Sequence, residues 1–571
     1  MQRDLAALEA AEFDLVVIGG GMFGAAATLD AAQRGLRVAL IERADFGGAT
    51  SSHSFKMVHG GIRYLQHADV PRLRHSARAR TTFLRVAPHL VRPLPIVVPT
   101  YGWAMKSKAV LRLGMAAYDL LTLDRNRGIA DPARQIPSAS FIGRAALLER
   151  YPGLEPDGLT GAGVFCDGQM YNPPRLVLAF VQSAVAAGAV CANYVEASGL
   201  IQRSGRVAGV RARDVTTGDR LELRARMVLN AAGPYAEGIL TGSLGRGLTP
   251  ATPFSRDAYF LVRRPLIAGD QALTVPSRTW DPDAIVSRGG RHLFLVPWRG
   301  GTLVGVWHKV YLGDPDAYEI TEAELAAWIA EIRQAYRGLD LSLDDVALGS
   351  AGLVPFGEND PDAVDLKYAH RSRIVDHAGE RGLEGLITLI GVRYTTGPVE
   401  AVEAVDLVCR RLELKAARSR LETTPVRGGD FTDFGQLVEQ IAAAAGDLPR
   451  ATVHALAHNH GTGAAAMLRG DPELRQLLPA STVLAGEVAQ AASDEMALTL
   501  ADAVFRRTDL CTLGHPGEPA LRAAARIMGA GLAWTQARVD AELDYVRARL
   551  RLATTGRALL AEPVVQRDLV S

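Results

Sequence analysis

The sequence predicts an α/β protein whose first part is a Rossmann-like nucleotide-binding domain. A strand–turn–helix–strand unit with glycines in GxGxxG spacing occupies residues 14–42. Two later segments, 225–239 and 385–408, repeat the order of an apolar run, a glycine-containing turn and a helix. Residues 434–571 then carry apolar side chains at three- and four-residue spacing, which predicts a helical C-terminal domain.

The glycine-rich turn of the first unit predicts a bound dinucleotide. It follows the apolar run DLVVI (14–18) and contains Gly19, Gly21 and Gly24. The first glycine permits a tight turn, the second lets the backbone approach a pyrophosphate, and the third lets the helix pack closely on the strand. An alanine-rich helix and a second apolar run follow. Glu42 ends that run, where it suits hydrogen bonds to an adenosine ribose.

The turn alone does not separate FAD from NAD, but the later segments favour FAD. Nucleotide-facing patterns extend from residue 14 to residue 408, which fits a long, two-ended cofactor. A nicotinamide enzyme more often completes its cofactor domain in one contiguous block. The further residues expected at the cofactor are Thr50, Ser51, Ser52, Gly233, Gly391, Thr395 and Thr396.

Several motifs together resemble the FAD-dependent glycerol-3-phosphate dehydrogenase and oxidase family. The family's stretch after the ribose-binding acid ends in His-Gly-Gly-x-Arg-Tyr-Leu, as does GATSSHSFKMVHGGIRYLQ here. The chain's other matching motifs are VLNAAGPYA, HLFLVPWRGGTLVGVWHKVYLGDP, IGVRYTTGP and ADAVFRRTDLCTLG. The resemblance covers nearly the whole chain and implies a divergent member of that family.

The resemblance also implies roles for the His-Gly-Gly stretch and for three arginines. His59, Gly60 and Gly61 should run beside the flavin ring. Arg63 and Tyr64 should point into the substrate cavity, with Arg63 toward an anionic group; the alternative is an ordinary ion pair and packing ring. Arg371 matches a family arginine, and Arg393 stands in place of a family lysine. These cations suffice to bind a phosphate or carboxylate.

Other expected site positions depart from the family pattern. Val354 replaces a family arginine, and Tyr259 lies near the usual histidine. Trp307 would add aromatic surface to the cavity, unless it is a packing residue. With one cation lost, we expect glycerol-3-phosphate to be a poor substrate or none, and the ligand to be larger, less charged or held differently.

The expected reaction is oxidation of an alcohol carbon of glycerol-3-phosphate or a related anionic polyol, with hydride passing to the flavin. We expect His308 as the base and Tyr259 as its hydrogen-bonding partner; a structural role for His308 is the alternative. The alternative functions are a flavin-dependent amine or amino-acid oxidase, and a flavin-binding protein with a non-redox role. His53 leaves covalent attachment of FAD open. The electron acceptor, quinone or oxygen, also stays open.

The expected organisation is an FAD domain over 1–425, an interleaved α+β substrate cap near 76–160 and 246–349, and a helical domain over 434–571. Lys+Arg total 63 and Asp+Glu 62, so there is no overall basic field to attract nucleic acid. Four scattered cysteines without a CxxC pattern predict neither a disulfide framework nor a metal site.

The expected location is cytoplasmic, because the first residues lack the apolar core of a signal peptide. Residues 102–123 form a basic amphipathic segment. Such segments are more often core or interface helices, but this one is also compatible with peripheral attachment to the inner face of the cytoplasmic membrane. Its basic and apolar residues are Lys106, Lys108, Arg112, Trp103, Met105, Leu111 and Met115. The oligomeric state stays open, a homodimer included.

Overall fold

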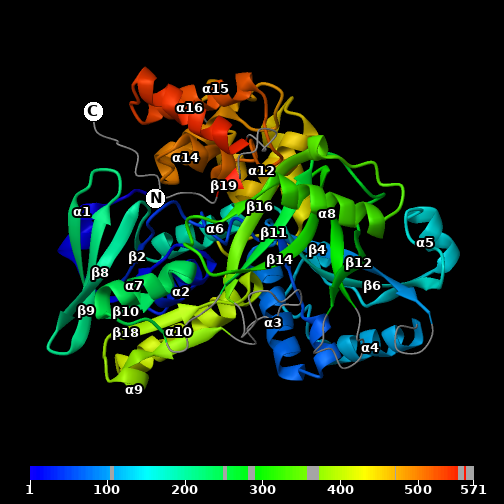
Figure 1. Cartoon of the computed structure of the whole chain (residues 1–571). Coiled ribbons are helices and arrows are strands. Elements are labelled where there is room, and N and C mark those ends of the chain that lie inside the picture. Colours follow the sequence, from blue (N-terminus) through cyan, green and yellow to red (C-terminus); the bar gives the residue numbers. More distant parts are fainter. Residues whose placement is uncertain are drawn as a thin grey trace.

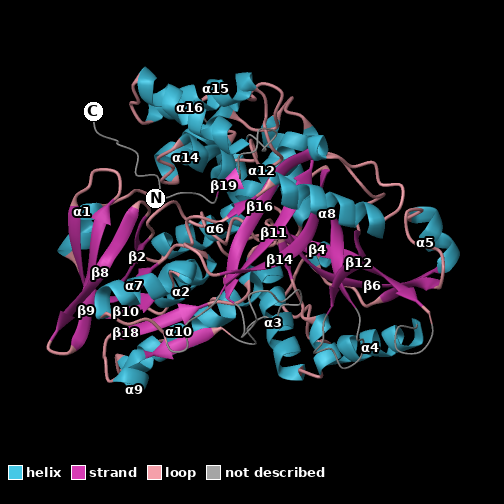
Figure 2. Cartoon of the chain, in the orientation of Figure 1, coloured by secondary structure: helices cyan, strands magenta, loops and turns pink. Residues whose placement is uncertain are grey.

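Two sheets lie side by side in the computed structural model, and the C-terminal helices cover them from above in Figure 1. Figure 2 shows that helices flank both sheets. The structure describes residues 1–102, 108–248, 254–280, 290–355, 372–469, 471–550 and 559–560. The predicted α/β fold, with a Rossmann-like domain, an α+β cap and a helical C-terminal domain, is confirmed.

The first sheet, on the left in Figure 1, has a parallel centre. Its strand order is β17-β18-β10-β1-β2-β7, and β9 and β8 extend it antiparallel from β10. Since β2, β1, β10 and β18 run parallel, their carboxyl ends meet at one edge. The strands are β1 (Glu12–Ile18), β2 (Val38–Ile41), β7 (Val190–Ala192), β8 (Val195–Arg203), β9 (Arg206–Asp214), β10 (Arg220–Asn230), β17 (Arg373–Asp376) and β18 (Leu386–Ile390).

Both faces of this sheet are buried, as its apolar central strands predict. One face packs with α2, α6 and α10 in a single apolar cluster, and the other packs with α1 and α7. Helix α2 is rich in alanine and glycine, so α6 and α10 approach it closely. The helices of this part are α1 (Leu5–Ala10), α2 (Met22–Gln33), α3 (Val70–Val86), α6 (Pro173–Ala186), α7 (Ala236–Leu244), α9 (His377–Arg381) and α10 (Gly397–Arg411).

The second sheet is almost wholly antiparallel and forms the cap. Its order is β16-β11-β14-β13-β12-β4-β6-β3, with β5 beside β6 and one parallel pair, β12 with β4. Its strands are β3 (Met57–Val58), β4 (Val91–Tyr101), β5 (Ser140–Gly143), β6 (Leu159–Met170), β11 (Phe254–Val262), β12 (Ala272–Trp280), β13 (Gly290–Trp298), β14 (Gly301–Tyr311) and β16 (Val346–Pro355), and its helices are α4 (Lys108–Leu121), α5 (Arg144–Arg150) and α8 (Glu322–Ala335).

The cap sheet extends beyond the ranges 76–160 and 246–349 expected from sequence. It takes in β3, almost all of β6 and the second half of β16, segments that were expected in the FAD domain. The sequence hid these strands because LTGAGVFCDGQM and VALGSAGLVP are rich in glycine and alanine and lack clear alternation. The division of the chain into domains otherwise stays a prediction.

The C-terminal helices form two apolar clusters of their own. They are α11 (Phe434–Ala445), α12 (Arg450–His460), α13 (Ala464–Met467), α14 (Ala485–Asp494), α15 (Glu518–Gly531) and α16 (Gln536–Leu550), with the π-helical turn η9 (Asp502–Arg507) between α14 and α15. The short strands β15 (Glu319–Ile320) and β19 (Leu559–Leu560) pair antiparallel. Within the described ranges, no helix is both long and apolar enough to cross a bilayer.

Candidate active site

The glycine-rich turn after β1 has the close packing expected of a phosphate-binding turn. Gly19 has φ +105°, and a Cβ there would lie 2.7 Å from the carbonyl oxygen of Ala231. A Cβ on Gly24 would lie 1.9 Å from the carbonyl oxygen of Gly19. Gly21 is the N-cap of α2, and a Cβ on it would meet only the Ser51 hydroxyl, at 3.2 Å. Two of the glycines are therefore needed by the fold itself, whereas the protein leaves room at Gly21.

The three hydroxyl residues predicted to face phosphates occupy different positions. Ser51 Oγ accepts a hydrogen bond from the backbone N–H of Met22 at 3.0 Å, so it lies at the N-terminus of α2. Thr50 donates to the carbonyl oxygen of Leu353 at 3.0 Å, and Ser52 donates to the carbonyl oxygen of Gly47. Ser51 is thus placed where a helix N-terminus attracts an anion, while the other two hydroxyls hold the loop.

Glu42 lies directly after β2, as predicted. Its two carboxylate oxygens accept the backbone N–H groups of Gly20 at 2.6 Å and Ala44 at 2.9 Å. Burial raises its pKa, and the two backbone donors oppose that shift. Each oxygen keeps acceptor capacity beyond these bonds. The carboxylate therefore fits hydrogen bonds from the ribose hydroxyls of a dinucleotide.

The other two predicted cofactor segments converge on the same edge of the sheet. Gly233 follows β10 with φ +55° and has open space around it. Gly391 follows β18, where a Cβ would lie 1.9 Å from the ring of Phe23. The Thr395 hydroxyl accepts the backbone N–H of His59 at 3.0 Å, and the Thr396 hydroxyl donates to the carbonyl oxygen of Arg393. Segments distant in sequence therefore form one cradle, which fits FAD.

A buried polar cluster, not predicted from sequence, holds the His-Gly-Gly stretch. Asp167 accepts the backbone N–H of Gly60 at 2.6 Å and lies 3.2 Å from Nδ1 of His59. Burial would raise the Asp167 pKa, but His59 and Arg80 lower it below its usual range. A Cβ on Gly60 would lie 2.2 Å from Arg80 and 2.3 Å from the Tyr118 hydroxyl. No local sequence motif predicted this cluster, because its members come from separate helices and strands.

Two guanidinium groups lie near the Tyr64 ring. The guanidinium of Arg393 lies 5.0 Å from the centre of the Tyr64 ring. That of Arg72, which sequence reasoning missed, lies 4.3 Å from it, and burial lowers the Arg72 pKa. Arg63 is exposed on the 3₁₀ turn η1 (Ile62–His67). Arg371 lies outside the described residues.

On the cap sheet, the two expected proton-handling residues belong to separate pairs. Nδ1 of His308 lies 2.9 Å from a carboxylate oxygen of Asp257. The Tyr259 hydroxyl accepts a hydrogen bond from Lys56, a buried lysine that the sequence analysis did not single out. The Lys56 ammonium also lies 4.9 Å and 5.0 Å from the ring centres of Tyr259 and Trp298. Tyr259 is therefore the partner of a cation.

Trp307 does not add aromatic surface next to Tyr259, so that prediction was wrong. Its ring stacks 4.7 Å from Trp328 on α8 and 5.7 Å from Phe260. Its indole N–H donates to Glu331 at 2.9 Å. Tyr259 belongs to a different apolar cluster, with Phe55 beside it. The alternation of β11 explains the separation, since consecutive side chains point to opposite faces of a sheet.

Val354 lies on β16, four residues after Ser350. Nδ1 of His53 lies 2.8 Å from the Ser350 hydroxyl, and a Cβ on Gly352 would lie 3.5 Å from His53. Because alternate residues of a strand share a face, Ser350, Gly352 and Val354 face the segment that carries Thr50 and His53. Val354 is half-buried there.

Two family models match consecutive parts of the chain, and both describe oxidoreductases or oxidases. Residues 14–393 match the family model described as FAD dependent oxidoreductase, and residues 419–539 match the C-terminal domain of alpha-glycerophosphate oxidase. A Synechocystis glycerol-3-phosphate dehydrogenase is 28% identical over 95% of this chain and 97% of its own. A probable mitochondrial glycerol-3-phosphate dehydrogenase of Caenorhabditis elegans is 32% identical over 94% of this chain and 73% of its own.

A solved structure shares the overall fold. The glycerol-3-phosphate dehydrogenase from Bacillus halodurans, complexed with FAD, superposes with a TM-score of 0.73 at 22% identity, covering 99% of this chain and 98% of that one.

Proposed function

The chain belongs to the FAD-dependent oxidoreductase family, among the glycerol-3-phosphate dehydrogenases and oxidases, and on that premise we propose that it oxidises an alcohol carbon of glycerol-3-phosphate. The observation that carries the proposal is the convergence of three separate segments on one edge of the parallel sheet, where the His59 backbone N–H donates to the Thr395 hydroxyl. FAD, when bound, supplies the two-electron acceptor. Every other task falls to side chains of this chain.

The chain has residues for each part of the cofactor. Gly21 and Ser51 would hold the phosphates at the N-terminus of α2, and Glu42 would accept hydrogen bonds from the ribose. The glycines of the His-Gly-Gly stretch let the backbone lie close to a flat ring, and Asp167 fixes that backbone. FAD dependence follows from the family and fits this donor set.

We assign the substrate anion to the cations near Tyr64. Arg393 contacts the Tyr64 ring, and Arg63 lies one residue before it. A guanidinium binds two oxygens of a phosphate at once, which gives orientation as well as charge. Arg72, which also lies over the Tyr64 ring, adds a positive charge and supports the choice of a phosphorylated substrate.

We assign proton removal to His308. The contact with Asp257 favours the tautomer with a proton on Nδ1, which leaves the basic lone pair on Nε2. Asp257 also stabilises the imidazolium that forms. To Tyr259, whose hydroxyl accepts a hydrogen bond from Lys56, we assign a hydrogen bond to the substrate oxygen. In this proposal His308 and Tyr259 have separate partners, whereas we had expected them from the sequence to act as one pair.

We also propose peripheral membrane contact at the cytoplasmic face, with quinone as the electron acceptor. Of the residues expected to carry this contact, Trp103, Met105 and Lys106 lie outside the described residues. Met115 is buried, and both Met115 and Leu111 pack against Gly163 of β6. Among the described residues of this region, the side chains of Leu113, Leu120 and Leu123 are exposed, at 74%, 68% and 75%. Homodimer formation stays a prediction.

Anaerobic reduction of the bound flavin tests the proposed substrate. Glycerol-3-phosphate should bleach the flavin absorbance near ~450 nm, because reduction removes the oxidised ring chromophore. A panel of amines and amino acids is the comparison. Bleaching by an amine but not by glycerol-3-phosphate would establish the oxidase alternative. Failure of every small substrate would favour a flavin-binding protein with a non-redox role.

A further inference from the structure

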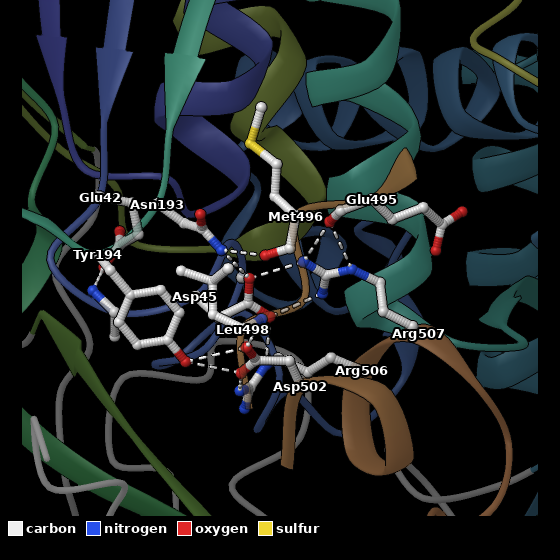
Figure 3. Close-up of polar contacts among 12 residues, drawn as sticks. Glu42, Asp45, Asn193, Tyr194, Glu495, Met496, Leu498, Asp502, Arg506 and Arg507 are labelled. Carbon is white, nitrogen blue, oxygen red and sulfur yellow. Dashed lines mark hydrogen bonds and ion pairs between the residues drawn. The ribbon is translucent and has the colours of Figure 1, made fainter. Parts of the chain in front are cut away.

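Two arginines of the C-terminal helical domain are bonded to the loop that carries the ribose-binding acid. Asp45 lies three residues after Glu42 and receives both of them (Figure 3). Arg507 donates to the two oxygens of Asp45 at 2.6 and 2.7 Å, and Arg506 donates to one of them at 2.6 Å. Both arginines end η9, more than 450 positions away in sequence. A bidentate pair of this kind fixes orientation as well as distance.

The contact is deeply buried. Asp45 and Arg507 are each 1% exposed, and Arg506 is 3% exposed. Burial would raise the Asp45 pKa, but the two guanidinium groups lower it below its usual range. A charge pair at such depth is costly to break from one side, because the remaining partner is left desolvated. The pair therefore holds the loop and the C-terminal domain in one relative position.

The loop that Asp45 anchors is itself packed on the phosphate turn. Glu42 accepts the N–H of Gly20, and the N–H of Gly47 donates to the carbonyl oxygen of Gly20 at 2.9 Å. A Cβ on Gly20 would lie 2.7 Å from Phe46 and 2.9 Å from Glu42. Residues 42–47 and the turn therefore move together. A shift of Asp45 would displace both the carboxylate expected at the ribose and the backbone expected at the pyrophosphate.

A second connection runs in parallel through Asn193 and Tyr194, which follow β7. The Asn193 amide donates to Asp45 at 2.9 Å and to the carbonyl oxygen of Met496 at 2.7 Å. The Tyr194 backbone N–H donates to the carbonyl oxygen of Ala44, and its hydroxyl donates to Asp502 at 2.8 Å. Figure 3 shows these side chains converging between the loop and η9. These bonds add to those of Arg506 and Arg507 in joining the adenosine end of the cofactor site to the C-terminal domain.

We propose that Arg507 is a positioning residue for the adenosine half of FAD, and that the C-terminal domain completes the cofactor site through Asp45. The inference rests on FAD binding at Glu42 and goes beyond it. Coupling between two sites is reciprocal, so bound FAD should in turn stabilise the docking of the C-terminal helices. The flavin half of the site, held by Asp167 and Thr395, lies on other segments and should not depend on Arg507.

Binding of the two halves of the cofactor to FAD-free protein separates this role from general destabilisation. ADP, riboflavin and FAD are titrated calorimetrically into wild type, Arg507→Met and Arg299→Met. The control Arg299 pairs with Asp509 at 2.6 Å, so it joins the cap to the same C-terminal region without touching the loop. We expect Arg507→Met to weaken ADP and FAD binding about 5- to 100-fold, with riboflavin affinity unchanged. Arg299→Met should leave all three affinities unchanged.

Two milder variants keep the test decisive if Arg507→Met does not fold. Tyr194→Phe removes only the hydroxyl that donates to Asp502, and Arg507→Lys keeps the charge but loses the bidentate geometry. Each should weaken ADP binding a few-fold while sparing riboflavin. Equal loss of ADP and riboflavin, loss in the Arg299 variant, or no loss in any Arg507 or Tyr194 variant would overturn the proposal. If wild type binds FAD tightly in any of these cases, the assignment of FAD as the cofactor still holds and only the role of Arg507 is refuted.

Discussion

The backbone N–H of His59 donates to the Thr395 hydroxyl at 3.0 Å, although 336 residues separate the two. This bond joins the first cofactor segment to the third, beside the parallel strands β1, β10 and β18. A site assembled in this way requires the folded sheet, so the flavin cradle forms with the first domain as a unit. The phosphate turn is its most local part and gives the first prediction.

Gly21→Val should abolish FAD retention without unfolding the protein. Gly21 has an ordinary negative φ, and a Cβ there meets only the Ser51 hydroxyl, so the obstacle is to the pyrophosphate. The ratio of released FAD to protein, with thermal unfolding of FAD-free samples, gives the measurement. Gly143→Val is the matched control, since Gly143 also caps a helix at negative φ and has open space around it. Full FAD occupancy in the Gly21 variant would refute the placement of the phosphate turn.

Arg63→Ala and Arg393→Ala should weaken substrate-dependent flavin reduction while leaving FAD bound. Each removes a charge-assisted contact to the anion, which corresponds to about 10- to 100-fold in apparent affinity. Arg371→Ala, at a position outside the described residues, is expected to behave in the same way. Stopped-flow reduction at varied glycerol-3-phosphate concentration measures the effect. Arg411→Ala, at a surface arginine paired with Asp376, is the control. Unchanged kinetics in all three site variants would place the anion elsewhere.

The sequence predicted the fold and the cofactor more completely than the substrate site. Glycine spacing and the acid after β2 are local patterns, so the adjacent sequence was enough to single out Gly19, Gly24 and Glu42. Lys56 and Asp167 were missed because their significance depends on partners from distant strands, Tyr259 and Gly60.

Trp307 was misplaced for a different reason. A difference from the family pattern shows that a residue has changed, but it does not show on which face of the sheet the new side chain lies. On β14, the Trp307 side chain lies on the face that packs against α8.

Tyr259→Phe should destabilise the protein. The change leaves the buried Lys56 ammonium without its hydrogen-bond acceptor, at a cost of about 1–3 kcal/mol in the free energy of unfolding. The double variant Lys56→Met/Tyr259→Phe should recover much of that loss, because it removes both polar groups. Urea unfolding of the single and double variants measures the coupling. Additive losses would show that the two side chains do not stabilise one another.

Glu495 should make the C-terminal domain sensitive to acid. Burial would raise its pKa, but Arg175 and His460 lower it to about 2 from an ordinary value of 4.5. A carboxylate with a lowered folded pKa stabilises the protein above its unfolded pKa, and the contribution is lost as pH falls from about 4.5 toward 2. The full effect is on the order of 3 kcal/mol.

Denaturant unfolding at pH 6 and pH ~3 tests this dependence. Glu495→Gln should be less stable than wild type at the higher pH and closer to it at the lower one. Glu439→Gln is the control, because Glu439 forms an exposed pair with Arg450. A constant difference between wild type and Glu495→Gln at both pH values would show that this carboxylate does not titrate with unfolding.

Val354→Arg should improve the use of glycerol-3-phosphate. Two features had predicted a larger or less charged ligand: the aromatic surface of Trp307 and the missing cation at Val354. The first no longer applies, because the Trp307 ring stacks on Trp328 of α8. The electrostatic argument remains. A dianionic phosphate in a partly desolvated pocket needs several cationic donors, and Val354 offers none where the family has an arginine. Val354 lies half-buried on the face of β16 that meets His53, so an added guanidinium would point toward the same region as the flavin segments.

The gain expected from this charge is about 10- to 100-fold in apparent affinity, equivalent to a charge-assisted hydrogen bond of about 1.5–3 kcal/mol. Val354→Met is the matched control, since it adds length without charge. Steady-state kcat and KM with glycerol-3-phosphate, measured for wild type and both variants, distinguish the outcomes. A fall in KM for the arginine variant alone would show that wild type lacks a cation at this position. Efficient turnover by wild type, with the arginine variant no better, would mean that Arg393 already supplies the charge, since its planar fork reaches two phosphate oxygens where a lysine offers one point charge.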